Sequence, residues 1–274
     1  MKKTIEVTIE KQKEIQLLML NEFKRVCDIN NINYSLGGGT LLGAIRHKGY
    51  IPWDDDIDVM MMRSDYEKIL QIFNEQCEIN EYKLLSYKNT DDYYYPFAKI
   101  VNLKTKIEEY SYIKIEELGI YIDIFPIDFL PNDEKQIKRI YKKYKNFNIL
   151  LNIYKIGKKD KITKNKIKLI LKKPINWLLS KFKMHRLILK NIDNLGTKYN
   201  NTNKVACISG RYFEKEIMSS NYISDYLLVD FENEKYKAAI GYHDYLTKHY
   251  GDYMKLPPKD KQISNHDNIA YWKK

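Results

Sequence analysis

Hydrophobic residues in the first part of the chain predict a helix, a strand and a second helix, in that order. In residues 8 to about 30 they recur at helical spacing, with charged residues on the opposite face. A short apolar run at residues 32–36 is followed by a glycine triplet at residues 37–39 and a second apolar run at residues 40–45. This order is typical of a strand that enters a helix through a tight loop.

A further strand and helix are predicted after Pro52. Residues 56–62 suit a buried strand, because the last four of them are all apolar. Ser64 and Glu67 have the spacing of a capping box, which predicts a helix from there to about residue 77.

Three β-prone segments follow, separated by turn residues. They are residues 82–87, 94–101 and 120–125, and Pro126 is expected to close the last of them. One mixed sheet can hold these strands together with the earlier ones. We therefore expect an α+β protein whose core, residues 1–132, contains a mixed β-sheet.

A basic helical module, residues 133–195, follows the core. Breaks in its helical pattern are expected at residues 157–158 and at Pro174. Residues 135–190 hold 19 Lys or Arg against the single acid Asp160, a net charge of +18, so that the rest of this +11 chain carries −7. The positive charge therefore belongs to the module and not to the whole protein.

Two interpretations of this charge stay open. In one, the lysines are only solvated, because the richness of the chain in Lys, Asn, Ile and Tyr reflects coding bias. In the other, residues 135–190 make a peripheral contact with an anionic membrane. No nucleic-acid partner is expected, since few aromatic residues alternate with the lysines and no nucleic-acid motif is present.

The C-terminal part, residues 196–274, is expected to contribute a helix that completes the functional site. Hydrophobic residues of residues 236–250 lie along one side of a helix that ends at Gly251, a candidate C-cap. No repeat or low-complexity linker divides the chain.

Several features indicate a cytoplasmic protein. The apolar runs are shorter than the roughly 18 residues of a membrane span. The N-terminus has two lysines but neither an apolar segment nor a small-residue cleavage site. The three cysteines are widely spaced and odd in number, which argues against a disulfide framework and a structural zinc site.

The glycine triplet is the first candidate for binding chemistry. Glycines between a strand and a helix let the backbone approach a ligand closely. The N–H groups of the helical turn that begins near Thr40 can cradle a phosphate, with Gly38 and Gly39 beside it. Glycines in loops more often serve turns, so the triplet alone is weak support.

An acidic run supplies the second candidate. In a strand, Asp54, Asp56 and Asp58 would project on one face, while Ile57 and Val59 face the core. Such crowded carboxylates repel one another unless cations neutralise them, and hard oxygen ligands suit Mg²⁺ or Mn²⁺. A solvated acidic loop is the alternative, and the alternation with apolar residues disfavours it.

Asp123 is the best candidate for a further metal ligand. An aspartate flanked by bulky apolar residues in a strand is unusual without a partner. If its strand lies beside the Asp56 strand, the two backbones are about 4.8 Å apart, close enough to share metal ions. Asp128, beyond Pro126, is the weaker choice.

Several motifs together resemble the LicD family. They are GGTLLGA, RHKG and IPWDDDIDV within residues 38–59, YPFAK at 95–99, IDIFP at 122–126, and YGDYM at 250–254 with His266 behind it. Members of that family are phosphocholine transferases, distantly similar to fukutin-related phosphoribitol transferases. The resemblance implies a nucleotidyltransferase fold for the core, with its glycine loop and metal-binding acids.

The resemblance also implies a reaction. The donor would be CDP-choline or a similar nucleotide, the acceptor a hydroxyl of a cell-surface glycan or of its lipid-linked precursor, and the leaving group CMP. Metal ions on the four aspartates named above would neutralise the developing charge. Arg46, Lys48 and Lys99 are candidate cations for the diphosphate, and His47 and His266 candidate acid–base groups.

Two alternatives keep the fold and the metal site. One transfers another phosphoalcohol, glycerol- or ribitol-phosphate, from its CDP form; the other is a nucleotidyltransferase that uses NTPs. A choline ammonium is normally held by aromatic faces. The 24 tyrosines permit such a cage without locating it, although residues 93–95 lie near the expected region. The family pattern also leads us to expect a proline between residues 211 and 245, and there is none.

Overall fold

A computed structural model describes residues 5–76, 79–108, 113–155, 166–210, 212–263 and 269–273. The helices are α1 (Ile9–Ile29), α2 (Gly38–His47), α3 (Arg63–Gln76), α4 (Glu134–Tyr154), α5 (Lys166–Lys181), α6 (Met184–Gly196), α7 (Phe213–Glu216) and α8 (Tyr242–Tyr250). The strands are β1 (Ser35–Leu36), β2 (Asp58–Met62), β3 (Tyr82–Leu85), β4 (Ala98–Asn102), β5 (Thr105–Glu108), β6 (Tyr121–Leu130), β7 (Lys204–Ala206), β8 (Met218–Ser219), β9 (Tyr226–Phe231), β10 (Glu234–Ala239) and β11 (Ile269–Trp272).

The main sheet is mixed, as the sequence predicts. Its strands lie in the order β1-β2-β6-β4-β3, β7 extends it from β6, and β8 pairs with β7. Strands β2 and β6 are parallel, and the other pairs are antiparallel. The register sets Asp58 of β2 and Lys99 of β4 on either side of Asp123 in β6. Three charged residues on three adjacent strands thus lie side by side in the sheet.

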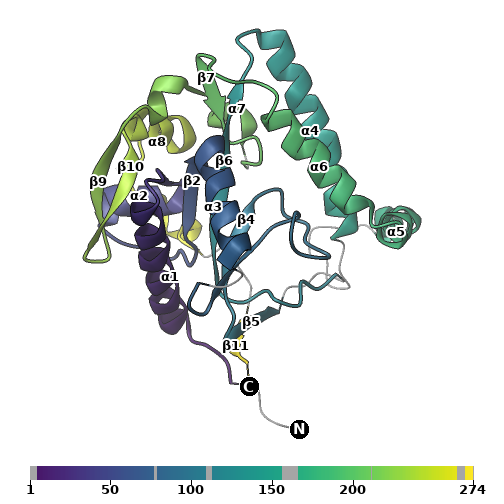
Figure 1. Ribbon diagram of the computed structural model, residues 1–274, viewed down its shortest axis with the longest axis horizontal. Helices are drawn as coiled ribbons and strands as arrows, with labels where there is room; N and C mark the ends of the chain where they lie inside the picture. The colour runs from purple at the N-terminus through teal and green to yellow at the C-terminus, as the bar shows by residue number, and fades with distance from the viewer. Residues whose placement is uncertain are drawn as a thin grey trace.

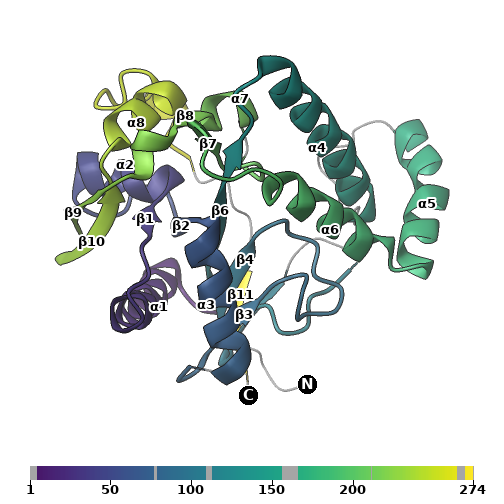
Figure 2. The ribbon, with the colours of Figure 1, turned by 45° about the horizontal axis from the view of Figure 1, so that its top comes forward.

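Helices cover the sheet and also extend beyond it. Helix α1 packs on β6 and β4 through a stripe that includes Met19, Leu20 and Phe23, all nearly inaccessible to solvent. Helix α3 packs on β2, β3 and β6. Figures 1 and 2 show α4, α5 and α6 gathered at one end of the molecule, and α2, α8 and the β9–β10 hairpin at the other.

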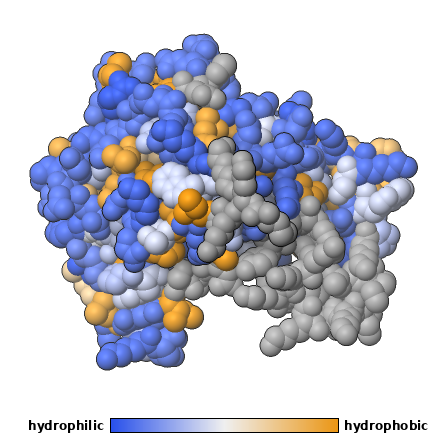
Figure 3. Space-filling model, turned by 90° about the horizontal axis from the view of Figure 1, so that it is seen from below, coloured by the Kyte–Doolittle hydropathy of each residue, from blue (hydrophilic) through white to orange (hydrophobic). Residues whose placement is uncertain are grey.

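Within the described ranges, no helix combines the length and the apolar character that a bilayer crossing needs. On the face shown in Figure 3, the described surface is mostly hydrophilic, with hydrophobic residues in small groups.

Pro126 does not end its strand, contrary to the prediction. Strand β6 continues through it to Leu130. On one side β6 pairs with β4 as far as Ile124, and with β7 only from Asp128 onward. Pro126 therefore falls between two partners, where the missing N–H breaks no pairing on that side.

Two helix predictions also need correction. Helix α3 begins at Arg63, so Ser64 is helical and does not cap it. Pro174 lies inside α5, at an exposed position, and does not break the helix. The break expected at residues 157–158 lies outside the described residues.

Residues 236–239 form a strand, not the start of the predicted helix. Glu232 and Asn233 both have positive φ, 51° and 67°, and they join β9 to β10 as a two-residue hairpin turn. Only the second half of the predicted helix exists, as α8, and Gly251 caps it with φ +71°.

A buried ion-pair network ties the sheet to the basic helices. Arg63 binds both carboxylate oxygens of Asp128 in β6, at 2.7 and 2.9 Å, and its Nη1 donates to Asp193 of α6 at 2.7 Å. The Tyr87 hydroxyl donates to the second oxygen of Asp193 at 2.8 Å. One guanidinium thus joins α3, β6 and α6.

Removing Arg63 should destabilise the protein strongly. In Arg63→Ala, Asp128 is left buried without its countercharge, and the expected loss is about 3–5 kcal/mol in the free energy of unfolding, measured with urea. Arg25→Ala serves as the control, because Arg25 makes an exposed pair with Glu22. Equal stability of the two variants would contradict this role for Arg63.

Candidate active site

Four aspartates gather in one cleft. Asp58 opens β2, and Asp123 lies directly opposite it in β6. Asp54 and Asp56 precede β2 in an irregular segment, so strand alternation is not what aligns them. All four nevertheless line a cleft of about 880 Å³, a volume in the range of sites for small-molecule ligands and cofactors.

The glycine loop lies directly against two of these carboxylates. Helix α2 begins at Gly38, two residues before the position expected from the sequence, and Gly38 has φ +47°. A Cβ atom on Gly38 would lie 2.5 Å from Oδ2 of Asp58, and one on Gly39 2.5 Å from Oδ2 of Asp54. The glycines are therefore required for the carboxylates to reach the start of the helix.

Thr40 fixes the backbone of the acidic segment. Its buried hydroxyl accepts a hydrogen bond from the Asp58 N–H at 2.9 Å and lies 3.5 Å from the Asp56 carbonyl. The Thr40 side chain is thus engaged with the protein's own backbone, and the prediction that the N–H groups of this turn bind phosphate does not involve it.

Lys99 is the internal countercharge of the acidic cluster. Its Nζ donates to Oδ1 of Asp123 at 2.6 Å, and both side chains are largely buried. The ammonium also lies 3.4 Å from the ring centroid of Tyr121 and 4.4 Å from that of Tyr95. Lys99 thus acts on the cleft through Asp123, and is not among the described residues that line it.

The cluster makes ionisation of Asp58 unfavourable. Loss of water around the carboxyl is the largest cause that raises the pKa of Asp58 well above its ordinary value, and repulsion from Asp56, Asp123 and Asp54 adds to it. Lys99 opposes the shift. A cation bound among these groups would relieve the repulsion.

The ligand chemistry suits a hard divalent cation. Four carboxylates offer only oxygen ligands, as Mg²⁺ and Mn²⁺ prefer. In the parts of the chain that the structure describes, no three His, Cys, Asp or Glu side chains already form a coordination shell. Asp123 also has one oxygen bonded to Lys99. The donors would therefore have to close around an ion.

Arg46 and His47 stand at the edge of the cleft. Arg46 lines it and donates from Nη1 to the Tyr253 carbonyl at 2.9 Å, which ties α2 to the C-terminal loop. Nε2 of His47 accepts from Nε of Arg46 at 2.9 Å, and its ring meets Trp53 edge-on. Burial and the neighbouring Arg46 lower the pKa of His47.

The remaining predicted residues take other places. Lys48 is the left-handed C-cap of α2, with φ 60°, and neither Lys48 nor His47 is among the described residues that line the cleft. His266 lies outside the described residues. The structure therefore brings together the glycine loop, the four aspartates and Arg46.

The C-terminal part brings to the cleft two residues that the sequence analysis did not name, Glu216 and His249. Glu216 of α7 and His249 of α8 both line the cleft, with Oε1 and Nε2 3.1 Å apart but without hydrogen-bond geometry. Nδ1 of His249 lies 2.9 Å from the Tyr245 carbonyl, so this nitrogen carries the proton. The position of His249 directly before the Tyr250-Gly251 motif was the signal in the sequence that could have identified it.

Aromatic rings also line the cleft, although not those expected. Tyr93 and Tyr94 are buried, and the Tyr95 ring contacts Lys99 and Lys155. The rings in the cleft belong to Trp53, Phe125, Tyr212, Tyr245, Tyr250 and Tyr253.

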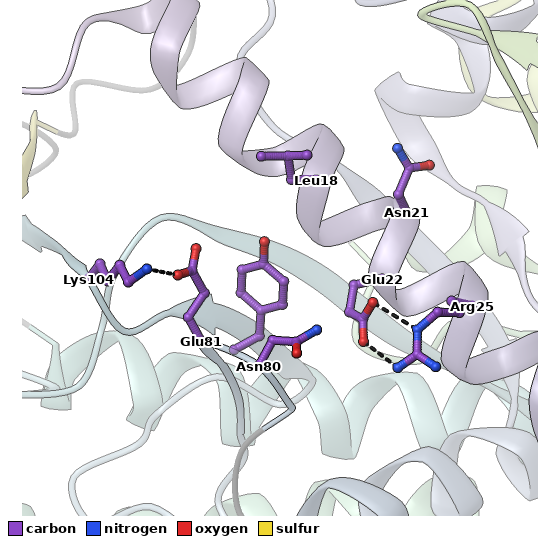
Figure 4. Close-up of a pocket in the computed structure, with 8 residues that line it drawn as sticks. Leu18, Asn21, Glu22, Arg25, Asn80, Glu81 and Lys104 are labelled. Carbon is purple, nitrogen blue, oxygen red and sulfur yellow. Dashed lines mark hydrogen bonds and ion pairs between the residues drawn. The ribbon is translucent and has the colours of Figure 1, made fainter.

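A second hollow, shown in Figure 4, differs in kind. It lies between α1 and the residues around the start of β3, and its charged side chains are already paired, Glu22 with Arg25 and Glu81 with Lys104. It contains none of the aspartates described above, so we place the candidate active site in the acidic cleft.

Comparison with known proteins points to one family. The model of the family described as LicD/FKTN/FKRP, nucleotidyltransferase domain, matches residues 31–151, which include the glycine loop and all four aspartates. The lipopolysaccharide cholinephosphotransferase LicD of Haemophilus influenzae is 33% identical over 272 residues, 97% of this chain and 98% of that protein. An uncharacterized protein of Rickettsia prowazekii is 34% identical over 118 residues, 42% of this chain and 41% of that protein.

These comparisons settle the family. The chain belongs to the LicD family, as the motifs predicted, and is a phosphotransferase enzyme.

An alanine at Gly38 should disable the cleft. In Gly38→Ala the new methyl group must displace Asp58, and a misplacement of this kind is expected to lower phosphotransferase activity by about a hundredfold. Gly251→Ala is the matched control, since Gly251 also has positive φ but nothing lies within 4 Å of its Cβ position. Both variants should lose about 1–2 kcal/mol of stability from backbone strain, and only the first should lose activity. Equal activity in both would contradict the contact.

Asp58 should make stability depend on pH. Because its pKa is raised on folding, the folded protein holds the proton more strongly, and stability falls as pH rises from about 4, the unfolded pKa, through the folded pKa. Asparagine cannot ionise. In urea unfolding with a chelator present, Asp58→Asn should therefore gain stability relative to wild type between pH 4 and pH 8. A difference that does not change with pH would refute the shift.

Proposed function

We propose that this enzyme transfers phosphocholine from CDP-choline, or a closely similar nucleotide, to a hydroxyl of a cell-surface glycan or its lipid-linked precursor, with release of CMP. The observation that carries the proposal is the 33% identity to a lipopolysaccharide cholinephosphotransferase along nearly the whole of both chains. The acidic cleft adds a site suited to phosphate chemistry.

The proposed core has the nucleotidyltransferase fold. Three features support it. Helix α2 begins at the glycine loop, strand β2 follows it and carries Asp58, and the parallel neighbour β6 carries Asp123. The N–H groups of the first turn of α2 have no side-chain cap, so they are suited to bind a phosphate oxygen of the donor.

The proposed cofactor is Mg²⁺ or Mn²⁺, held by Asp54, Asp56, Asp58 and Asp123. When bound, the ion would neutralise negative charge on the transferred phosphoryl group. Thr40 holds the backbone of the acidic segment in place, and Lys99 orients Asp123. Arg46 lines the cleft and is the proposed cation for the diphosphate, although it also secures the C-terminal loop.

The choline group would be held by the aromatic rings of the cleft. A quaternary ammonium binds to aromatic faces, and Trp53, Tyr250 and Tyr253 belong to the same cleft as the aspartates. This assignment replaces residues 93–95, whose rings are buried or in contact with lysines.

The proposed site of action is the cytoplasm, at the inner face of the cell membrane. A lipid-linked glycan acceptor would be present there. The net charge of +18 on residues 135–190 favours a peripheral contact with anionic lipid. Such a contact accounts for the charge without a nucleic-acid partner.

Release of CMP from CDP-choline tests the proposal. Wild-type enzyme with Mg²⁺ or Mn²⁺ and a crude lipid-linked glycan fraction should release CMP in an acceptor-dependent way, and a chelator should stop the release. Asp56→Asn should lower the rate at least about a hundredfold, because Asp56 would help to hold the ion that neutralises the transition-state charge. Asp55→Asn is the matched control, since Asp55 is not among the described residues that line the cleft.

Other donors separate the alternatives. Activity with CDP-glycerol or CDP-ribitol and none with CDP-choline would keep the mechanism and reject choline. Consumption of NTP with release of pyrophosphate would identify a nucleotidyltransferase. Full activity of Asp56→Asn would reject the acidic site.

A further inference from the structure

Helix α5 lies at the outer edge of the molecule. Figures 1 and 2 both place it beyond α4 and α6, on the side away from α2 and α8 and so away from the acidic cleft. Its inner side is fixed: Leu179 is buried, and the Asn176 side chain donates to the carbonyls of Ile153 and Tyr154 at the end of α4. One side of α5 is thus tied to the protein, and the other faces solvent.

The outer side of α5 is strongly hydrophobic. Trp177 is 60% exposed and Phe182, just past the last helical residue, is 62% exposed; Ile175 and Leu178 are also exposed. Ile175, Leu178 and Phe182 are three and four residues apart, so they follow one face of the helix, and Trp177 lies about 100° around the helix from Leu178. We call these four residues the apolar edge. Burial on the protein's own core does not explain them.

The sequence around the apolar edge is strongly basic. Residues 161–192 contain ten Lys or Arg and no acid. Lys181 and Lys183 are exposed beside it, and Nζ of Lys181 lies 4.7 Å from the centroid of the Trp177 ring. A tryptophan with an adjacent lysine is the combination that lies at the boundary between lipid headgroups and acyl chains.

We infer that α5 is a membrane anchor, whose apolar edge enters the interface of an anionic bilayer while the flanking lysines bind lipid headgroups. The inference gives residues to the peripheral contact proposed above, and it does not depend on which group the enzyme transfers. An amphipathic helix with aromatic residues on one side and lysines around it binds membranes in this way.

Charge favours a bilayer over a second copy of the chain. A symmetric dimer through the same edge would bring two strongly cationic segments together, and like charges at short range repel. Anionic headgroups instead complement the lysines. The position of α5 away from α2 and α8 also leaves the cleft open while the helix lies on the membrane.

Vesicle flotation with the full chain tests the anchor. We expect binding to vesicles of phosphatidylcholine with phosphatidylglycerol, and little binding to phosphatidylcholine alone. Trp177→Ala with Phe182→Ala should weaken binding by about tenfold for each ring removed from the interface. Lys181→Gln with Lys183→Gln should weaken it by roughly fivefold for each lysine. The matched control is Leu18→Ala with Leu228→Ala, two side chains each 59% exposed elsewhere, which should bind as wild type does.

Trp177 also gives a direct signal. Its fluorescence emission should shift to shorter wavelength on the anionic vesicles, and Trp177→Phe should remove most of that shift while binding persists. Unchanged flotation of the Trp177 and Phe182 double variant, or equal binding to neutral vesicles, would overturn the inference. A wild-type dimer in solution that this double variant abolishes would also overturn it, in favour of a contact between copies.

The membrane anchor and the proposed phosphotransfer reaction can be tested independently of each other. Donor cleavage measured with soluble substrates and no membrane should be the same in the anchor variants and the wild type. Vesicle binding without any CDP-choline cleavage would leave the anchor in place and reject the proposed function. CDP-choline cleavage without vesicle binding would reject the anchor alone.

Discussion

Repulsion among like charges is the constraint on which the site depends. Asp54, Asp56, Asp58 and Asp123 share one cleft, and the pKa of Asp58 is raised first by lost hydration and then by repulsion from the other three. The fold holds them there with the parallel strands β2 and β6 and with Thr40, which binds the backbone of the acidic segment. It also has glycines at the positions beside the carboxylates where a side chain would not fit. A protein that keeps such an arrangement gives up stability for chemistry.

The surrounding structure limits this cost. Lys99 neutralises Asp123 from the neighbouring strand, within aromatic rings that exclude water. Further along the same strand β6, Asp128 is neutralised by Arg63, which joins the sheet to α6. One strand thus carries an acid at the cleft and an acid at the junction with the basic helices. The strand that carries Asp123 in the cleft is therefore also bonded, through Arg63, to a helix of the basic part.

Much of this arrangement could be predicted from the sequence, because local patterns determine it. The glycine triplet, the apolar run after Asp58 and the apolar neighbours of Asp123 each indicate their own element, whereas Asp54 and Asp56 lie in an irregular segment that their alternation did not predict. The β9–β10 hairpin was missed because its turn uses Glu232 and Asn233, not glycine. Glu216 and His249 were missed because they reach the cleft only through tertiary packing of α7 and α8. Continuation of β6 through Pro126 depends on the neighbours of that strand, which no local pattern contains.

The most direct test of the central claim is a titration with Mn²⁺, followed by the electron paramagnetic resonance signal of the free ion. Wild type should bind Mn²⁺, Asp58→Asn should bind it at least about tenfold more weakly because a charged ligand is lost, and Asp55→Asn should bind it as wild type does. Absence of binding in the wild type, or equal affinity in all three proteins, would contradict a metal site built from the crowded aspartates.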